Sequence, residues 1–307
     1  MASNIERAII KTLIYADIFD YPLTLTEIEK YLIKVKNQPF DFGEIRFPFA
    51  QGRNEKVKIT IKNLKNKKIL YEKDGYYFLQ RKKYIVKERK ERKVYSERKI
   101  EIACKVASFL KFIPSVKLIG ITGALAVNNS KKDDDLDLIV ITSSKLLWTT
   151  RFLVTLLVEL LGVRRHPGGF VTSDKICLNM FLDEEHLSLP IKDRDLFSAH
   201  EIIQVKPIYD RNQTYQRFLQ ENLWVKKYLP NGLKFKMQKS KVKSTIQKSK
   251  IFLMYIESVL KSFQLWYMRK RRTTEVINEG IIRFHPEDAR VWVMKKYKQK
   301  VSSDKYG

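Results

Sequence analysis

The segment 116–142 constrains the fold of this chain more than any other stretch. It holds two apolar, β-branched runs of strand length, Val116–Ile121 and Leu136–Thr142, separated by Gly123, one turn of helix (124–127) and a polar loop. The second run is apolar on both faces, which is typical of a strand buried inside a sheet. We therefore predict a strand, a glycine turn and a second, central strand.

Two acidic residues open the second strand. Asp135 and Asp137 are two positions apart, so their side chains leave the same face, roughly 7 Å apart at about 3.3 Å per residue. Carboxylates at that spacing suit Mg²⁺ or Mn²⁺ ions that stabilise the attacking and leaving oxygens of a displacement at phosphorus. The alternative is an acidic turn before the strand, which describes Asp133 and Asp134 well. We predict that Asp135 and Asp137 are catalytic and bind metal.

The same segment resembles a known family. An apolar strand, Gly123 followed by a small residue, and then Asp135-Leu136-Asp137-Leu138 resemble the nucleotidyltransferase superfamily with its polymerase-beta-like palm. The resemblance covers roughly residues 116–208. It implies an NTP substrate, two Asp that bind the catalytic metal ions, and a turn and loop that bind the nucleotide through Thr122, Gly123, Ala124 and Ser130.

The chain departs from the family pattern at two positions. The family usually has Ser where this chain has Ala124, so Thr122 or Ser130 would have to supply that phosphate contact. The family also has a third carboxylate on a neighbouring strand, whereas the matching strand, 175–182, carries Asn179. An Asn can coordinate a metal weakly through its carbonyl oxygen but cannot accept the nucleophile's proton.

Other polar residues near that strand are secondary candidates. Asp174 and Asp183 lie at its ends and could replace the missing acid, while Glu201, on a later helix, is expected to face solvent by default. The basic loop 162–173 carries Arg164, Arg165 and His166, which could meet a triphosphate or a nucleic-acid backbone. The Pro-Gly-Gly that follows them is equally consistent with a plain turn.

The charge of the chain points to a polyanionic partner. Sixty Lys and Arg against 34 Asp and Glu give a net charge of +26 over 307 residues. Such a charge favours nucleic acid first and an anionic membrane surface second. A basic source proteome or a contribution to solubility would also explain it.

Several classes of protein are disfavoured by the sequence. Cys104 and Cys177 are expected in the core, and with four scattered His they form neither a zinc motif nor a disulfide framework. The first residues include charges before any apolar run, so no signal peptide is predicted. The longest apolar stretch, 152–162, is far short of the roughly 20 residues that a membrane span needs. We expect no membrane span and a cytoplasmic location.

Residues 1–80 are predicted to form a winged-helix-like domain. Apolar stripes at 5–16 and 57–64, a capping box from Thr24 to Glu27 and an Asp-Gly hairpin turn after Lys73 give helices followed by a hairpin. In winged helices the third helix commonly enters DNA, so we assign phosphate contacts to Lys58, Lys62 and Lys65. A protein-docking role and a merely solvated lysine face remain alternatives.

The rest of the chain divides into three parts. Residues 81–113 read as a basic connecting helix, 114–230 as the palm-like domain with a mixed sheet, and 231–307 as a basic C-terminal helical region. The predicted fold class is therefore α+β.

The leading hypothesis is a Mg²⁺-dependent nucleotidyltransferase that moves a nucleoside monophosphate from an NTP to an unknown acceptor, with nucleic acid favoured. The alternative is a catalytically inactive scaffold of the same fold that acts as a DNA-binding or regulatory protein. A third idea is an adaptor that rests on anionic lipid. The oligomeric state is left open.

Overall fold

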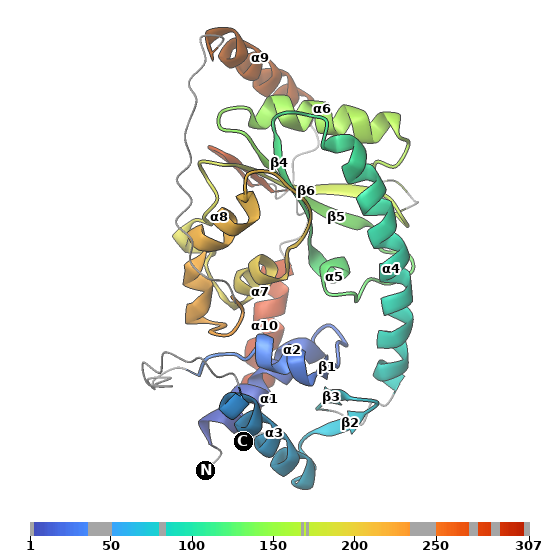
Figure 1. The fold of residues 1–307 in the computed structure, drawn as a ribbon, viewed down its shortest axis with the longest axis vertical. Helices are drawn as coiled ribbons and strands as arrows, with labels where there is room; N and C mark the ends of the chain where they lie inside the picture. Colours follow the sequence, from blue (N-terminus) through green and yellow to red (C-terminus); the bar gives the residue numbers. More distant parts are fainter. Residues whose placement is uncertain are drawn as a thin grey trace.

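The computed structural model describes residues 3–35, 51–79, 84–166, 169, 172–233, 250–269, 276–283 and 289–303. The segment 37–53, rich in Gly, Pro and aromatic residues, is expected to be a loop; most of it lies outside these ranges, although residues 51–53 belong to a helix. Helices and strands are mixed along the chain (Figure 1), which confirms the α+β fold class.

The N-terminal part combines three helices with a small antiparallel sheet of strand order β1-β3-β2. Its elements are α1 (Asn4–Asp17), β1 (Leu23–Thr24), α2 (Leu25–Lys30), α3 (Gln51–Asn66), β2 (Tyr71–Lys73) and β3 (Tyr76–Phe78). The predicted capping box is present, because the Glu27 N–H donates to Thr24 Oγ1 and Glu27 Oε2 accepts from the Thr24 N–H. Positive φ angles at Asp74 and Gly75 form the predicted hairpin turn.

A single long helix, α4 (Tyr84–Leu110), connects this part to the main sheet. Its 27 residues span about 40 Å at 1.5 Å per residue. Its N-terminal half lies beside the N-terminal part and its C-terminal half packs on the sheet (Figure 1). The predicted connecting helix is thus confirmed over this range.

The main sheet has six strands in the order β7-β4-β5-β6-β9-β8. It is mixed, because β5 and β6 run parallel whereas the other neighbours are antiparallel. The strands are β4 (Val116–Ile121), β5 (Leu136–Thr142), β6 (Ile176–Asp183), β7 (Lys206–Asp210), β8 (Val276–Asn278) and β9 (Ile281–Arg283). The first two match the predicted strands residue for residue. The segment 204–209 is expected to be an edge strand because it contains Pro207, and β7 does lie at the edge of the sheet.

The two faces of β5 belong to different cores. Leu136, Leu138 and Val140 pack with α4, α6 (Leu147–Leu160) and the end of α9 (Lys250–Met268). Ile139 and Ile141 pack on the opposite face with α7 (Leu196–Gln204), and the same core continues into the N-terminal helices and α10. Because side chains alternate along a strand, Asp135 and Asp137 project on this second face, toward α7.

The short α5 (Gly123–Ala126) adds Leu125 to the first core, that of Leu136, Leu138 and Val140. The elements that close the second core, that of Ile139 and Ile141, are the 3-10 turns Ile191–Asp193 and Leu223–Lys227, α8 (Thr214–Glu221) and α10 (Ala289–Ser302). On α10, the Tyr297 ring lies 5.8 Å from the Tyr15 ring of α1, and Lys300 pairs with Asp17. The last helix of the chain therefore contacts the first.

Three expectations about buried and helical segments are wrong. The region 231–307 is not only helical, since β8 and β9 extend the main sheet. Each of these strands has only three residues and they are joined by a turn at Gly280 (φ 71°), so neither is long enough to show the alternating pattern of a strand in the sequence. The strongly apolar segment 144–161 is expected to form a buried helix that backs the sheet, but the helix there, α6, is not fully buried, because Leu160 is 74% exposed. Cys104 is exposed and Cys177 only partly buried, so neither is a core residue. Among the described residues, no helix has the length and apolarity that crossing a bilayer requires.

The guanidinium of Arg89 joins three parts of the chain. It lies on α4, is 6% exposed, and pairs with Glu27 of α2 at 2.9 Å. It also donates to the carbonyl oxygens of Val127 and Asn128, which follow α5. The guanidinium carbon, Cζ, lies 4.0 Å from the Tyr21 ring centroid. One side chain thus holds the N-terminal part, the connecting helix and the loop after the glycine turn together.

Replacement of Arg89 is expected to destabilise the protein strongly. Arg89→Met leaves Glu27 and two carbonyl oxygens without their charged donor, so the free energy of unfolding should fall by about 3–5 kcal/mol in urea titrations. The control is Lys87→Met on the same helix, whose side chain is 82% exposed and should change that free energy by less than about 0.5 kcal/mol. Equal effects of the two substitutions would contradict this role.

Candidate active site

Gly123 brings the backbone next to an acidic side chain. Its φ of 63° is in the left-handed region, and an added Cβ would lie 3.2 Å from Asp137 Oδ2. The preceding residue, Thr122, donates its N–H to the Asp137 carbonyl oxygen at 3.0 Å. Only glycine combines this φ with this close approach without strain, so the sequence places the turn against the acid pair.

Asp135 and Asp137 converge as the strand period predicts. On β6, Cys177 pairs directly with Asp137 in the parallel register. Carboxylate oxygens of both Asp and the Cys177 sulfur lie within 4.8 Å of one another. The three side chains form one cluster at the start of two neighbouring strands.

Arg165 neutralises the outer acid of this cluster. Its guanidinium contacts Asp135 Oδ2 at 2.5 Å and Cys177 Sγ at 3.8 Å. The Arg165 N–H also donates to the Ile176 carbonyl at 2.9 Å, which aligns the basic loop with β6. The arginine side chain is 37% exposed, so it can exchange partners from solvent. Neighbouring Arg164 and His166 both contact Glu159 instead.

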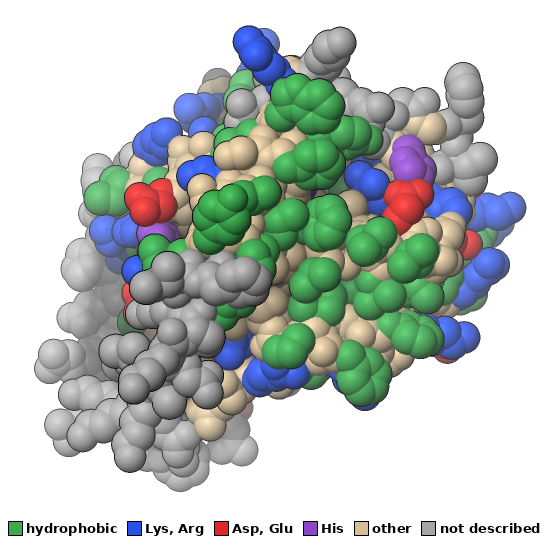
Figure 2. Space-filling model, turned by 90° about the horizontal axis from the view of Figure 1, so that it is seen from above, with side chains coloured by type: hydrophobic (Ala, Val, Ile, Leu, Met, Phe, Trp, Pro, Cys, Tyr) green, Lys and Arg blue, Asp and Glu red, His purple; other side chains and the backbone are tan. Residues whose placement is uncertain are grey.

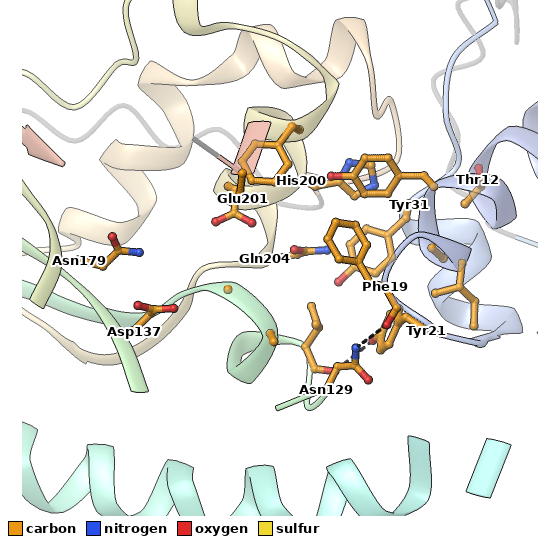
Figure 3. A pocket seen from close by; sticks show the side chains of 18 residues that line it. Thr12, Phe19, Tyr21, Tyr31, Asn129, Asp137, Asn179, His200, Glu201 and Gln204 are labelled. Atoms are coloured by element: carbon orange, nitrogen blue, oxygen red, sulfur yellow. Dashed lines mark hydrogen bonds between the residues drawn. The ribbon is translucent and has the colours of Figure 1, made fainter. Parts of the chain in front are cut away.

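A cavity of about 270 Å³ opens in front of Asp137. Figure 3 shows Asp137, Asn179 and Glu201 at one end and aromatic rings of the N-terminal part, including Tyr21 and Tyr31, at the other. The wall is predominantly aromatic and aliphatic. None of the described residues that line the cavity is Lys or Arg.

Glu201 is a third carboxylate at the cavity, so the default expectation that it faces solvent is wrong. Burial, followed by the nearby Asp137 carboxylate, raises the pKa of Glu201 to about 7. Burial, followed by the Asp135 carboxylate, likewise raises the pKa of Asp137 to about 7. Both groups therefore change charge near neutral pH, where a carboxyl can act as acid or base.

Asn179 also points into the cavity. It is 6% exposed, and its Oδ1 accepts no hydrogen bond from the residues that the structure describes. A buried carbonyl oxygen without a donor is costly unless a ligand or ion completes it.

The donor set fits a hard divalent cation. Asp135, Asp137 and Asn179 offer oxygen atoms, which Mg²⁺ and Mn²⁺ prefer. Cys177 is no competing ligand, because burial raises the pKa of its thiol and keeps it protonated.

Of the other predicted site residues, only some lie at the cavity. Ala124 lines it, but Ser130 does not: the Ser130 hydroxyl donates to the Lys131 carbonyl and the Ser130 N–H donates to Ser96 Oγ. Asp183 lies at the far end of β6 and accepts from backbone N–H groups, and Asp174 pairs with Arg98.

The predicted nucleic-acid residues lie on α3, apart from the cavity. Lys58 and Lys62 are exposed, whereas Lys65 pairs with Glu72 at 2.9 Å. The exposed pair remains available for phosphate contacts.

The sequence contains a signal that Glu201 faces inward. Phe197, His200, Glu201 and Gln204 all line the cavity, and their spacing i, i+3, i+4, i+7 marks one helix face. This face lies beside the apolar stripe of the same helix, Leu196, Ala199, Ile202 and Ile203. His200 is no candidate base, because burial lowers its pKa to about 4.

Comparisons with protein-family models, with curated protein sequences and with solved structures returned no match for this chain.

The raised pKa of Glu201 predicts a pH-dependent cost to stability. Between about pH 4.5 and 7 the folded state keeps a proton that the unfolded state releases, so the free energy of unfolding falls as pH rises and levels off above 7. Glu201→Gln removes this dependence. The free energy of unfolding of the variant should therefore rise by about 1–3 kcal/mol relative to that of the natural protein between pH 4 and 8. The measurement is urea unfolding in the presence of a metal chelator.

The matched control is Glu221→Gln, an exposed acid on α8, which should show no such pH-dependent gain. A constant difference between the Glu201 variant and the natural protein across this range would contradict the buried, protonated carboxyl.

Proposed function

We propose that the protein is a metal-dependent nucleotidyltransferase, which moves a nucleoside monophosphate from an NTP to an acceptor and releases pyrophosphate. The observation that carries this proposal is the convergence of the Asp135 and Asp137 carboxylates beside the Gly123 backbone, at the mouth of a cavity. The likeness of this segment to the polymerase-beta-like palm, and the mixed sheet around it, support the same assignment.

The polar residues around the cavity have distinct roles in this proposal. Asp135, Asp137 and the Asn179 carbonyl would hold Mg²⁺ or Mn²⁺, which supplies charge stabilisation for the attacking and leaving oxygens. The Gly123 turn leaves room for a phosphate beside Asp137, because no side chain fills that space. Arg165 would leave Asp135 and bind a phosphate oxygen, a bidentate contact that guanidinium groups favour.

Glu201 is the proposed general base. Asn179 cannot accept a proton, whereas Glu201 lines the same cavity and its pKa of about 7 suits proton transfer at neutral pH. In this scheme the carboxylate takes the proton from the acceptor's hydroxyl or amine as its oxygen or nitrogen attacks the α-phosphorus. Glu201 thus replaces, from a helix, the acid that the neighbouring strand lacks.

The cavity favours a small acceptor over a nucleic-acid end. The net charge of +26 alone favoured a polyanion, but the described lining is aromatic and contains no Lys or Arg. A phosphate backbone would need cations there. A neutral or amine-bearing molecule that stacks on Tyr21 or Tyr31 fits better. The helix and strand order of the N-terminal part supports a winged-helix-like module, here used as a wall of the cavity.

Loss of either acid should abolish catalysis without unfolding the protein. Asp135→Asn and Asp137→Asn should each lower Mg²⁺-dependent pyrophosphate release from NTP by about a thousandfold or more, because each removes a metal ligand. The matched control is Asp133→Asn, an exposed acid two residues before the pair, which should keep activity. Circular dichroism checks the fold. A natural protein that neither binds nor turns over any NTP with Mg²⁺ or Mn²⁺ would refute the proposal.

A second candidate function rests on the contact between Arg165 and Asp135. If that ion pair is permanent, it blocks one metal ligand, and with Ala124 in place of the family's Ser the site would be idle. The protein would then be a scaffold that binds DNA through the exposed lysines of α3 or regulates a partner. The behaviour of Arg165 separates the two functions.

Substitution of Arg165 should affect metal and nucleotide in opposite directions in an active site. Arg165→Gln frees Asp135, so Mg²⁺ should bind more tightly by calorimetry, while NTP binding in the presence of Mg²⁺ should weaken by about tenfold through loss of a phosphate contact. Arg164→Gln is the control, since Arg164 pairs with Glu159 instead. An idle site predicts tighter Mg²⁺ binding and no NTP binding by either protein.

A further inference from the structure

Helix α9 contacts α6 through two polar side chains, in addition to the apolar packing of Met268 at its end. The Glu257 carboxylate accepts the N–H groups of Trp148 and Thr149 at 2.7 and 2.8 Å, at the start of α6. Gln264 is 4% exposed, donates to the Trp148 carbonyl at 2.8 Å and accepts from Arg151. The inner side of α9 therefore carries the hydrogen-bonding groups that a surface helix normally turns to water.

The outer side of α9 is apolar and aromatic. Trp266 and Tyr255 are each 69% exposed, and Met254, Val259, Phe263 and Tyr267 are between 48% and 51% exposed. Exposed Leu156 and Leu160 of α6 and Phe109 and Phe112 at the end of α4 add to the apolar exposure of neighbouring elements. Figure 2 shows hydrophobic side chains gathered on this side of the molecule, with Lys and Arg at the margin. We call the outer surface of α9 and α6 the α9 face.

Exposed apolar side chains gathered on one face in this number mark a site that something covers. The reversed polarity of α9 strengthens this reading, since the helix gains little by packing Glu257 and Gln264 inward unless its outer residues are also removed from water. The question is which partner covers it.

The charges that flank α9 in the sequence select the partner. Residues 233–250 contain seven Lys and neither Asp nor Glu, and Arg269-Lys270-Arg271-Arg272 follows the helix directly. A second copy of the chain would bring two such flanks, each part of a chain of charge +26, toward one another. An anionic lipid surface would instead neutralise them while it buries the aromatic side chains.

We propose that the α9 face docks onto an anionic lipid bilayer, with α9 lying in the plane of the interface. Trp and Tyr are suited to the headgroup level, where an apolar ring and a polar edge are both satisfied. The N-terminal part, with its exposed lysines on α3, lies at the opposite end of the molecule from α9 (Figure 1) and faces away from the bilayer. This docking does not depend on the proposed catalytic activity.

The test is co-sedimentation of the full-length protein with vesicles. The protein should bind phosphatidylcholine vesicles that contain about one third phosphatidylglycerol and should bind pure phosphatidylcholine much more weakly. The double variant Phe263→Ser, Trp266→Ser should lower the partition coefficient for the anionic vesicles by about tenfold or more, because two aromatic side chains no longer enter the interface. The control is Ile191→Ser, which removes an apolar side chain that is 82% exposed outside the α9 face and should leave binding unchanged.

A second measurement uses the natural protein alone and so does not depend on the folding of a variant. Brominated acyl chains in anionic vesicles should quench tryptophan fluorescence, because Trp266 enters the bilayer. Binding that the double variant leaves intact, or the absence of quenching, overturns the proposal. A dimer in solution that the double variant dissociates, or RNA binding that the same variant abolishes, with no lipid binding in either case, also overturns it and assigns the α9 face to that partner.

Discussion

The buried guanidinium of Arg89 is the contact on which the site depends. A charge at 6% exposure needs nearby partners, and Arg89 has the ion pair with Glu27, two backbone carbonyls and the Tyr21 hydroxyl, whereas its Nε has no partner among the described residues. Glu27 belongs to α2 and the carbonyls to the loop after α5, so the contacts of one guanidinium hold the N-terminal part against the glycine turn. The aromatic wall that Tyr21 contributes to the cavity follows from that docking.

The cavity concentrates negative charge where solvent is scarce. Asp137 and Glu201 share this environment. Burial raises both pKa values to about 7, with a further contribution from the Asp135 carboxylate at Asp137 and from the Asp137 carboxylate at Glu201. Asp135 is relieved by Arg165, and the Asn179 carbonyl lacks a donor among the described residues. Such an arrangement is incomplete in electrostatic terms, and a divalent cation would complete it.

The two ends of the molecule present different chemistry around one central sheet. The N-terminal end carries exposed lysines on α3 and supplies part of the cavity wall, while the opposite end presents the apolar α9 face (Figure 1). The net charge of +26, which first indicated nucleic acid, is thereby divided among several regions. The described lining of the cavity contains no Lys or Arg, so the net charge of the chain does not indicate the chemistry of the cavity.

The sequence by itself determined the features that depend on neighbours along the chain. Strand alternation fixed that Asp135 and Asp137 share a face, and the residues between the two strands marked a turn at Gly123. Only the tertiary structure decided what faces them: Arg165 on Asp135 and Glu201 across the cavity. Periodicity tells which side of an element is apolar, but not which distant element covers it, and the partner of a charged side chain is set by chain segments that meet only after folding.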